Sequence, residues 1–173
     1  LGVDPDSSYP SVVQRLAKDA RLDIDVINGG LSGETSAGAL RRAEWLLSQR
    51  VAVLVIETGA NDGLRGLDPD TTAANITALI GKARARQPGV AIALMQMEAP
   101  PNLGPRYTRR FHAVFAEVAA ATGVRLLPFL LEGVGGKPDL NQDDGIHPNP
   151  EGARRVAANV FKSLRPVFDS LSR

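Results

Sequence analysis

The residues with the clearest chemical potential are a histidine and an aspartate in one short segment near the carboxyl end. Residues 143–149 read Asp-Asp-Gly-Ile-His-Pro-Asn, which places Asp144 three positions before His147. The proline after the histidine disfavours helical backbone at His147. A carboxylate at this spacing can accept a hydrogen bond from Nδ1–H and leave Nε2 to act as a general base. The segment therefore predicts a catalytic pair, and a capped loop histidine without chemical function is the alternative.

Two glycine-containing turns are suited to stabilise negative charge. Residues 28–36 read Asn-Gly-Gly-Leu-Ser-Gly-Glu-Thr-Ser, and residues 57–63 read Glu-Thr-Gly-Ala-Asn-Asp-Gly. Backbone N–H groups in such turns, and the neutral side-chain amide of Asn61, can donate hydrogen bonds to an oxyanion. Tight turns that simply need glycine explain both segments equally well. Neither G-x-G-x-x-G nor G-K-[ST] occurs, so a dinucleotide or P-loop nucleotide site is not indicated.

The other histidine, His112, is expected to have no catalytic role. It falls within a predicted helix beside an apolar stripe, and the sequence places no carboxylate to orient its ring. Because the chain has only two histidines, a histidine-based mechanism depends on His147.

Alternating strands and helices must position these turns. Continuous apolar runs at residues 51–56, 90–95 and 124–131 predict strands buried in a parallel sheet, and the alternating run at residues 22–27 predicts another strand. Since ligands of open parallel sheets bind at the carboxyl ends of strands, the turns that follow these strands are where the site is expected. The alternation predicts an α/β fold with right-handed crossovers.

Apolar positions at helical spacing predict the helices between these strands. Asp68 and Asn149 are each followed by proline, which is typical of a helix N-cap and first helical position, and Gly123 is typical of a helix end. The expected helices begin near Pro10, Ser36, Pro69, Pro105 and Pro150.

Three of these motifs, in this order, resemble a known family. Ser-Gly-Glu-Thr at 32–35, Gly-Ala-Asn-Asp at 59–62 and Asp-Gly-Ile-His at 144–147 are similar to blocks two, three and five of the SGNH (GDSL-type) hydrolases, most of all in the bacterial thioesterase I, lysophospholipase and arylesterase branch. The resemblance spans residues 8–171. It implies a flavodoxin-like three-layer α/β/α sandwich with parallel strand order 2-1-3-4-5, a single domain over residues 1–173, and no metal or organic cofactor.

The resemblance also implies a role for each motif residue. His147 is the general base and Asp144 the carboxylate that orients it, while the backbone N–H of Gly33 and the side chain of Asn61 are two of the three oxyanion donors. The expected reaction is attack of a serine Oγ on an ester or thioester carbonyl. An acyl-enzyme follows, and a water activated by His147 hydrolyses it.

The family's nucleophile lies in a Gly-Asp-Ser block after the first strand, and residues 1–8 resemble the loop that follows this block. We therefore expect an upstream segment that carries this strand and serine. The first strand is central in the implied sheet, and each buried backbone group left unsatisfied beside it costs about 1–3 kcal/mol. Two serines are alternative nucleophiles with poorer settings. Ser170 follows no buried strand, and Ser32 lacks the G-x-S-x-G spacing.

Apolar residues in the loops around the predicted site indicate the substrate class. Leu64, Leu67, Pro100 and Leu103 would give a lining that favours acyl or aryl esters over sugars, so the expected partner is a small-molecule ester or thioester.

Three other functions stay open at this stage. One is a non-catalytic binding module of the same fold, and another is acyl transfer to an alcohol instead of hydrolysis. The third is a metal-assisted phosphoesterase that uses Asp62, Asp143, Asp144 and His147, although a two-metal site normally needs more ligands than these.

Composition excludes several classes of protein. The 173 residues include 20 Lys+Arg and 19 Asp+Glu, and the basic residues occur as scattered pairs, so no nucleic-acid footprint is present. The chain has no cysteine, which excludes disulfides and thiol catalysis within it. No apolar stretch approaches about 18 residues, so no stable membrane insertion is expected. The resembled branch is often periplasmic, and a periplasmic or secreted bacterial location is favoured over a cytoplasmic one. The sequence does not predict an oligomeric state.

Overall fold

The computed structural model describes residues 4–171 and has an α/β fold. It divides into two compact units. The sheet unit is Gly30–Phe129, and the helix-pair unit consists of Leu1–Gly29 with Leu130–Arg173. The predictions for residues 1–3 and 172–173 lie outside the described residues.

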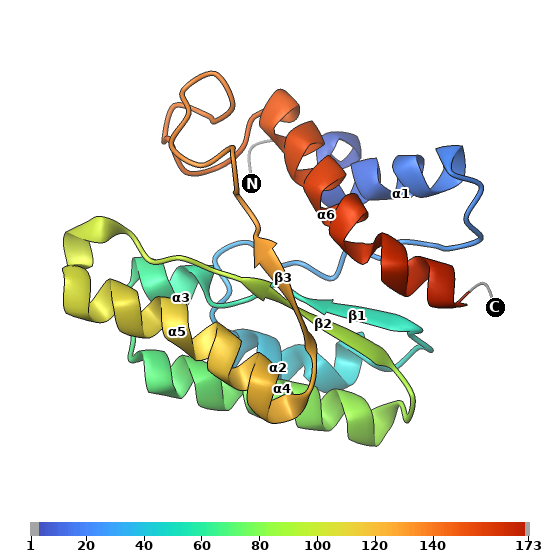
Figure 1. Cartoon of the computed structure of the whole chain (residues 1–173), viewed down its shortest axis with the longest axis horizontal. Helices are drawn as coiled ribbons and strands as arrows, with labels where there is room; N and C mark the ends of the chain where they lie inside the picture. The colour runs from blue at the N-terminus through green and yellow to red at the C-terminus, as the bar shows by residue number, and fades with distance from the viewer. Residues whose placement is uncertain (1–3, 172–173) are drawn as a thin grey trace. The chain divides into compact units, whose positions relative to one another are not determined.

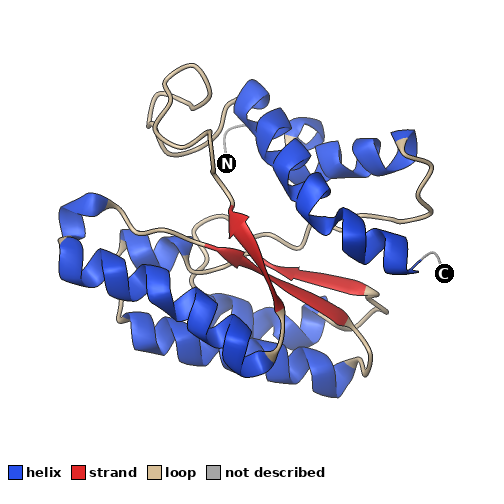
Figure 2. Ribbon diagram, in the orientation of Figure 1, coloured by secondary structure: helices blue, strands red, loops and turns tan. Residues whose placement is uncertain are grey.

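A parallel sheet forms the centre of the sheet unit, as predicted. Its neighbouring strands run in the order β1-β2-β3, drawn as red arrows in Figure 2. Leu54 pairs with Ile92, and Leu94 pairs with Leu126. This order matches consecutive strands of the implied 2-1-3-4-5 arrangement, and the single-domain assignment stays a prediction. The bounds are β1 Val53–Ile56, β2 Ala91–Gln96 and β3 Arg125–Phe129.

Helices of the sheet unit pack on one another and on the strands. Helix α4 contacts α2 and α5, and α5 contacts β2 and β3, so α4 and α5 lie side by side in Figure 1. Phe111 and Phe115 of α5 are fully buried and meet edge to face, with their ring centroids 5.4 Å apart. The bounds are α2 Ser36–Leu46, α3 Ala60–Leu64, α4 Pro69–Arg86, the 3-10 helix η2 Pro101–Leu103 and α5 Pro105–Thr122.

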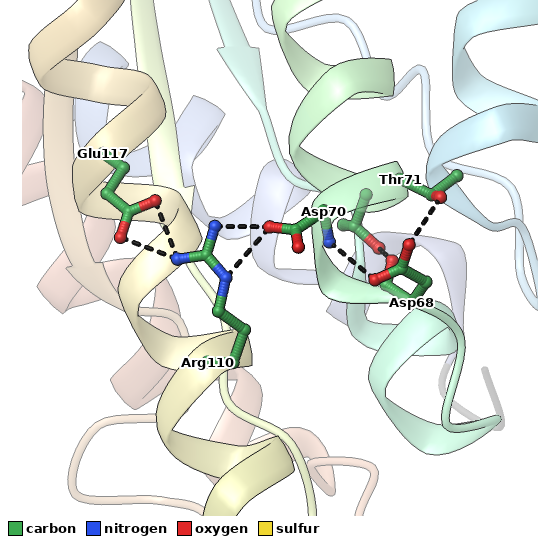
Figure 3. Close-up of polar contacts among 6 residues, drawn as sticks. Asp68, Asp70, Thr71, Arg110 and Glu117 are labelled. Carbon is green, nitrogen blue, oxygen red and sulfur yellow. Dashed lines mark hydrogen bonds and ion pairs between the residues drawn. The ribbon is translucent and has the colours of Figure 1, made fainter.

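A charged contact also joins α4 to α5. Arg110 donates to Glu117 of its own helix at 2.7 Å and forms an ion pair with Asp70 at the start of α4 (Figure 3). The same view shows Asp68 accepting hydrogen bonds from the Asp70 N–H and the Thr71 hydroxyl, both at 3.1 Å. The predicted N-cap of this helix is therefore confirmed.

Two helices dominate the helix-pair unit, and they pack against each other. Helix α1 buries Val12, Val13 and Ala17, while α6 buries a stripe that includes Val156 and Val160. The Asn149 side chain accepts hydrogen bonds from the N–H groups of Glu151 and Gly152 at 3.0 Å, so it caps α6 as predicted. The bounds are the 3-10 helix η1 Pro5–Ser7, α1 Tyr9–Asp19 and α6 Pro150–Leu171.

The strand predicted at residues 22–27 is wrong, because this segment is irregular. A strand needs a hydrogen-bonded neighbour, and within residues 4–171 no strand pairs with it. The Gln14 side chain takes the place of that neighbour. Its Nε2 donates to the Ile24 carbonyl at 3.0 Å, and its Oε1 accepts from the Val26 N–H at 2.6 Å.

Two further details differ from the sequence predictions. Most of β1 is only half-buried, whereas β2, which has a neighbour on each side, is buried from Ile92 onward. The segment expected to be a turn at residues 57–63 contains the short helix α3, which begins after Gly59 in the left-handed region at φ 101°. Glycine adopts this conformation without the steric cost that a side chain brings.

Candidate active site

His147 and Asp144 form a hydrogen-bonded pair in the loop that precedes α6. The ring Nδ1 lies 2.7 Å from Asp144 Oδ2. The other carboxylate oxygen, Oδ1, accepts from the backbone N–H groups of Ile146 and His147, both at 2.9 Å. One oxygen therefore fixes the turn while the other holds the ring, and both side chains are partly open to solvent.

These hydrogen bonds lower the pKa of Asp144 from 3.8 to about 2. The backbone N–H of His147 contributes most, followed by the His147 side chain and the N–H of Ile146. Asp144 is consequently ionised at neutral pH. It can accept a hydrogen bond from Nδ1–H and stabilise a protonated ring, but it cannot supply a proton as a general acid.

Backbone contacts close the loop that carries this pair. The Gln142 N–H donates to the His147 carbonyl at 2.8 Å, and its side-chain amide donates to the Pro148 carbonyl at 3.1 Å. The Asn149 N–H donates to the Leu140 carbonyl at 3.0 Å. The loop is therefore held at both ends, directly before the capped start of α6.

The backbone of the first turn of α6 lies close to the loop before it. At Gly152, in the first turn of the helix, a Cβ would lie 2.0 Å from the carbonyl oxygen of Leu140. Only glycine fits there without a backbone shift. Sequence reasoning missed this position, because nothing in a lone glycine at the start of a helix identifies the carbonyl that faces it.

The two predicted oxyanion donors lie in the sheet unit. Gly33 is exposed and adopts the left-handed region at φ 76°, and Asn61 is half-buried within α3. Hydrogen bonds tie their segments together. The Ser36 N–H donates to the Asp62 carboxylate at 2.8 Å, and the Arg65 guanidinium donates to the Gly33 carbonyl at 3.0 Å. The structure thus joins the Gly33 and Asn61 segments, and the pair of His147 and Asp144 belongs to the helix-pair unit.

The apolar residues predicted to line the substrate site lie in the two connections of the sheet unit that follow β1 and β2, with Leu64 at the end of α3 and Leu103 at the end of η2. Leu64 and Leu67 are 44% and 41% exposed, and Pro100 and Leu103 are half-buried. A Cβ at Gly66 would lie 3.6 Å from a Leu103 methyl group, so the two connections lie close together. Their assignment to substrate binding stays a prediction.

Tyr107 fastens the first of these connections. Its hydroxyl donates to the Leu67 carbonyl at 2.7 Å. Burial, and then the nearby charges of Asp62 and Asp68, raise the pKa of Tyr107, which keeps the phenol protonated as a donor.

His112 differs from expectation in one respect. It lies within α5 as predicted, but a carboxylate does face it, because Glu98 Oε1 lies 2.6 Å from its Nδ1. The Gln96 amide donates to the His112 carbonyl at 3.1 Å. Sequence reasoning missed Glu98 because strand β2 and helix α5 bring the two residues together only in the folded chain.

The alternative sites receive less support from the geometry. Asp62, a proposed metal ligand, is 2% exposed, and its carboxylate is occupied by hydrogen bonds from Ser36 and Thr72. No cluster of three or more His, Cys, Asp or Glu within residues 4–171 is arranged to hold a metal ion. Ser32 and Ser170 are both exposed, and the Ser170 hydroxyl donates to the Val167 carbonyl within α6.

None of the helices in the described part of the chain is both long and apolar enough to cross a lipid bilayer.

Comparison with protein families agrees with the motifs. The model of the GDSL-like Lipase/Acylhydrolase family matches residues 1–155, so the chain belongs to this family. The chain is 41% identical to Esterase TesA of Pseudomonas aeruginosa over 97% of its own length and 83% of the relative. It is 38% identical to an Arylesterase of Vibrio mimicus over 92% of its own length and 79% of the relative.

Solved structures give the same fold. The psychrotrophic esterase EstA from Pseudoalteromonas sp., inhibited by monoethylphosphonate, superposes with a TM-score of 0.91 at 36% identity, over 97% of this chain and 91% of that chain. The crystal structure of TesA superposes with a TM-score of 0.90 at 41% identity, over 96% of this chain and 92% of that chain. The α/β fold predicted from the motifs is therefore that of SGNH hydrolases.

Proposed function

We propose that this protein hydrolyses carboxylic esters or thioesters through an acyl-enzyme. The observation that carries the proposal is the hydrogen bond of 2.7 Å between His147 Nδ1 and Asp144 Oδ2. It selects the tautomer whose Nε2 is free to accept a proton. The low pKa of Asp144 keeps its carboxylate charged opposite the ring, and membership of the acylhydrolase family supports the same chemistry.

The proposed reaction proceeds in two halves. His147 Nε2 takes the proton of a serine hydroxyl while the serine oxygen adds to the carbonyl carbon, and the Gly33 N–H and the Asn61 amide donate to the resulting oxyanion. As the tetrahedral intermediate collapses, the bond to the leaving group breaks, and His147 gives its proton to the departing alcohol or thiol. A water molecule then loses a proton to His147 as its oxygen adds to the acyl carbon. When this second intermediate collapses, the bond to the serine oxygen breaks, His147 returns its proton to that oxygen, and the acid is released.

We further propose that the acyl or aryl group of the substrate contacts Leu64, Leu67, Pro100 and Leu103. Their exposed or half-buried apolar side chains lie in the connections that follow β1 and β2, at the edge where parallel sheets bind ligands. Similarity to an arylesterase supports an aryl ester as substrate. Rates for p-nitrophenyl esters should rise with acyl length, and Leu67→Asp should abolish this rise while short esters still react.

A periplasmic or secreted location is part of the proposal. It is supported by the resemblance to a branch that is often periplasmic and by the bacterial relatives, and the absence of cysteine is compatible with it. Cell fractionation with an antibody against the protein tests it, and recovery in the cytosolic fraction alone would contradict it.

The central test uses the full-length protein. It should hydrolyse short p-nitrophenyl esters, this activity should survive a metal chelator, and a fluorophosphonate should abolish it by labelling one serine, which peptide mapping identifies. Absence of hydrolysis with p-nitrophenyl and thioester substrates, together with absence of labelling, would overturn the proposal. Loss of activity on chelation would instead favour the metal-assisted alternative.

A further inference from the structure

A buried carboxylate lies directly beside the predicted oxyanion donor Asn61. Asp62 is 2% exposed, and three donors surround it. Its Oδ2 accepts from the Ser36 N–H at 2.8 Å, and its Oδ1 accepts from the Ser36 hydroxyl at 2.5 Å and the Thr72 hydroxyl at 3.2 Å. Burying a charged group costs free energy unless it is well hydrogen-bonded. The hydrogen bonds from Ser36 and Thr72 therefore make Asp62 a structural link, or tie, between α2, α3 and α4.

We infer that Asp62, assisted by Arg65, is a positioning residue that sets the Gly33 N–H against the Asn61 amide, an inference that rests on the proposed function. Asp62 follows Asn61 in α3, and Ser36 is the first residue of α2, three positions after Gly33. The hydrogen bonds between Asp62 and Ser36 therefore link the segment that carries the Asn61 amide to the segment that carries the Gly33 N–H.

The start of α2 strengthens this tie. The first N–H groups of a helix lack partners within it and carry the positive end of its dipole. The Asp62 carboxylate satisfies the N–H of Ser36 there. It thus holds the end of α2 by charge as well as by hydrogen bonding.

Helix α4 also donates hydrogen bonds to Asp62 and Ser36. The Asn75 amide donates to the Ser36 hydroxyl oxygen at 3.0 Å, so this hydroxyl accepts one hydrogen bond while it donates another to Asp62. Thr72 of the same helix completes the surroundings of the carboxylate. The Ser36 hydroxyl and Asp62 Oδ1 thus each take part in two hydrogen bonds, which connect α2, α3 and α4.

Arg65 provides a second tie at the other end of α3. Its guanidinium donates to the Gly33 carbonyl at 3.0 Å. The Gly33 loop is thus connected to α3 at Gly33 itself through Arg65 and at Ser36 through Asp62. Since an oxyanion donor must lie about 2.7–3.1 Å from the oxyanion, and a misplacement of about 1 Å can cost about a hundredfold in rate, these ties bear directly on kcat.

The principal variant is Asp62→Asn, which keeps the shape of the side chain but places an NH₂ group where one oxygen accepted a hydrogen bond. In the full-length enzyme, kcat for p-nitrophenyl acetate should fall about tenfold to a hundredfold, approaching the loss of one oxyanion donor. KM should change by less than about threefold, because the ester is bound by other groups.

Arg65→Met should lower kcat by about threefold, because this contact is exposed. Arg110→Met is its matched control. It removes an arginine of the same unit whose contacts are Asp70 and Glu117, and it should leave kcat unchanged. If Arg65→Met and Arg110→Met have equal effects, Arg65 has no positioning role.

A double-mutant cycle separates positioning from general destabilisation. Once Asn61→Ala has removed one donor, the alignment of the pair matters less, so Asp62→Asn should lower kcat less in this background than in the parent. If Asp62→Asn lowers kcat by the same factor in the parent and in Asn61→Ala, Asp62 acts independently of Asn61, and the inference is overturned.

Folding is checked by circular dichroism and thermal unfolding. Should Asp62→Asn fail to fold, Ser36→Ala replaces it. This variant loses the two hydrogen bonds of the hydroxyl, to Asp62 and from Asn75, and keeps the bond from the Ser36 N–H to Asp62. A smaller fall in kcat, about threefold, is then expected at constant KM. A folded variant with the parent's kcat overturns the inference while the proposed function stands. A parent that neither hydrolyses esters nor reacts with a fluorophosphonate overturns both.

Discussion

The two histidines of this protein lie in similar local geometry but in different settings. His147 Nδ1 lies 2.7 Å from Asp144 Oδ2 in a loop of the helix-pair unit, and His112 Nδ1 lies 2.6 Å from Glu98 Oε1 on the surface of the sheet unit. The distance between imidazole and carboxylate therefore does not by itself assign a catalytic role to either pair.

The surroundings of the carboxylate do distinguish them. Asp144 also accepts two backbone N–H groups, which fix its orientation and lower its pKa to about 2. The contact of Glu98 is with an exposed ring on a helix face, His112 being 60% exposed. A base that must be presented in one tautomer and one orientation needs a carboxylate that is itself held, and Asp144 meets this condition.

The largest effect is expected for His147→Ala, which tests whether His147 acts as the base. Without the general base, kcat for p-nitrophenyl acetate should fall by about 10⁶, as expected when the histidine of a catalytic triad is lost. Initial rates of the full-length enzyme measure this. A variant that retains more than a tenth of the parent's activity would show that His147 is not the base.

Gly152→Ala tests the close contact between the first turn of α6 and the loop that carries His147. Because the new Cβ would lie 2.0 Å from the Leu140 carbonyl oxygen, the backbone must shift, and the free energy of unfolding should fall by about 1–3 kcal/mol. Denaturant unfolding measures this.

Gly81→Ala in α4 is the matched control for Gly152→Ala. It has no atom within 4 Å of its added Cβ and should stabilise the protein by about 0.5–1 kcal/mol, as expected for alanine in place of a helical glycine. Loss of stability in both variants alike would argue against a specific contact at Gly152.

The charge of Asp144 should appear as a pH-dependent contribution to stability. Because folding lowers its pKa from 3.8 to about 2, this contribution is fully present above the unfolded value and is lost as the pH falls through the folded one. Urea unfolding of the parent and of Asp144→Asn should differ by a constant amount above about pH 5, and by less as the pH falls from 4 towards 2. A difference that grows towards low pH would contradict the assigned direction.

The smallest effect is expected for the other pair. His112→Ala should change kcat by less than about twofold, and the free energy of unfolding by at most about 1 kcal/mol, because exposed ion pairs contribute little. Rates and denaturant unfolding of this variant provide the counterpart to His147→Ala. A large fall in kcat would place Glu98 and His112 in the active site.

Local patterns predicted most of the fold. The caps at Asp68 and Asn149 depend on a side chain and the N–H groups two or three residues later, so the sequence is sufficient to find them. The strand expected at residues 22–27 depends on a partner elsewhere, and alternation of residue types does not supply one. There the side chain of Gln14 bonds the backbone instead.

The same division holds for the candidate site. The sequence by itself determined the pair of His147 and Asp144, because a contact across three residues is built into a turn that proline and glycine enforce. Only the tertiary structure decided the contacts of Asp62 with Ser36, of Glu98 with His112 and of Gly152 with Leu140. Each of these joins separate elements, and their meeting depends on how helices and strands pack, which residue spacing does not specify.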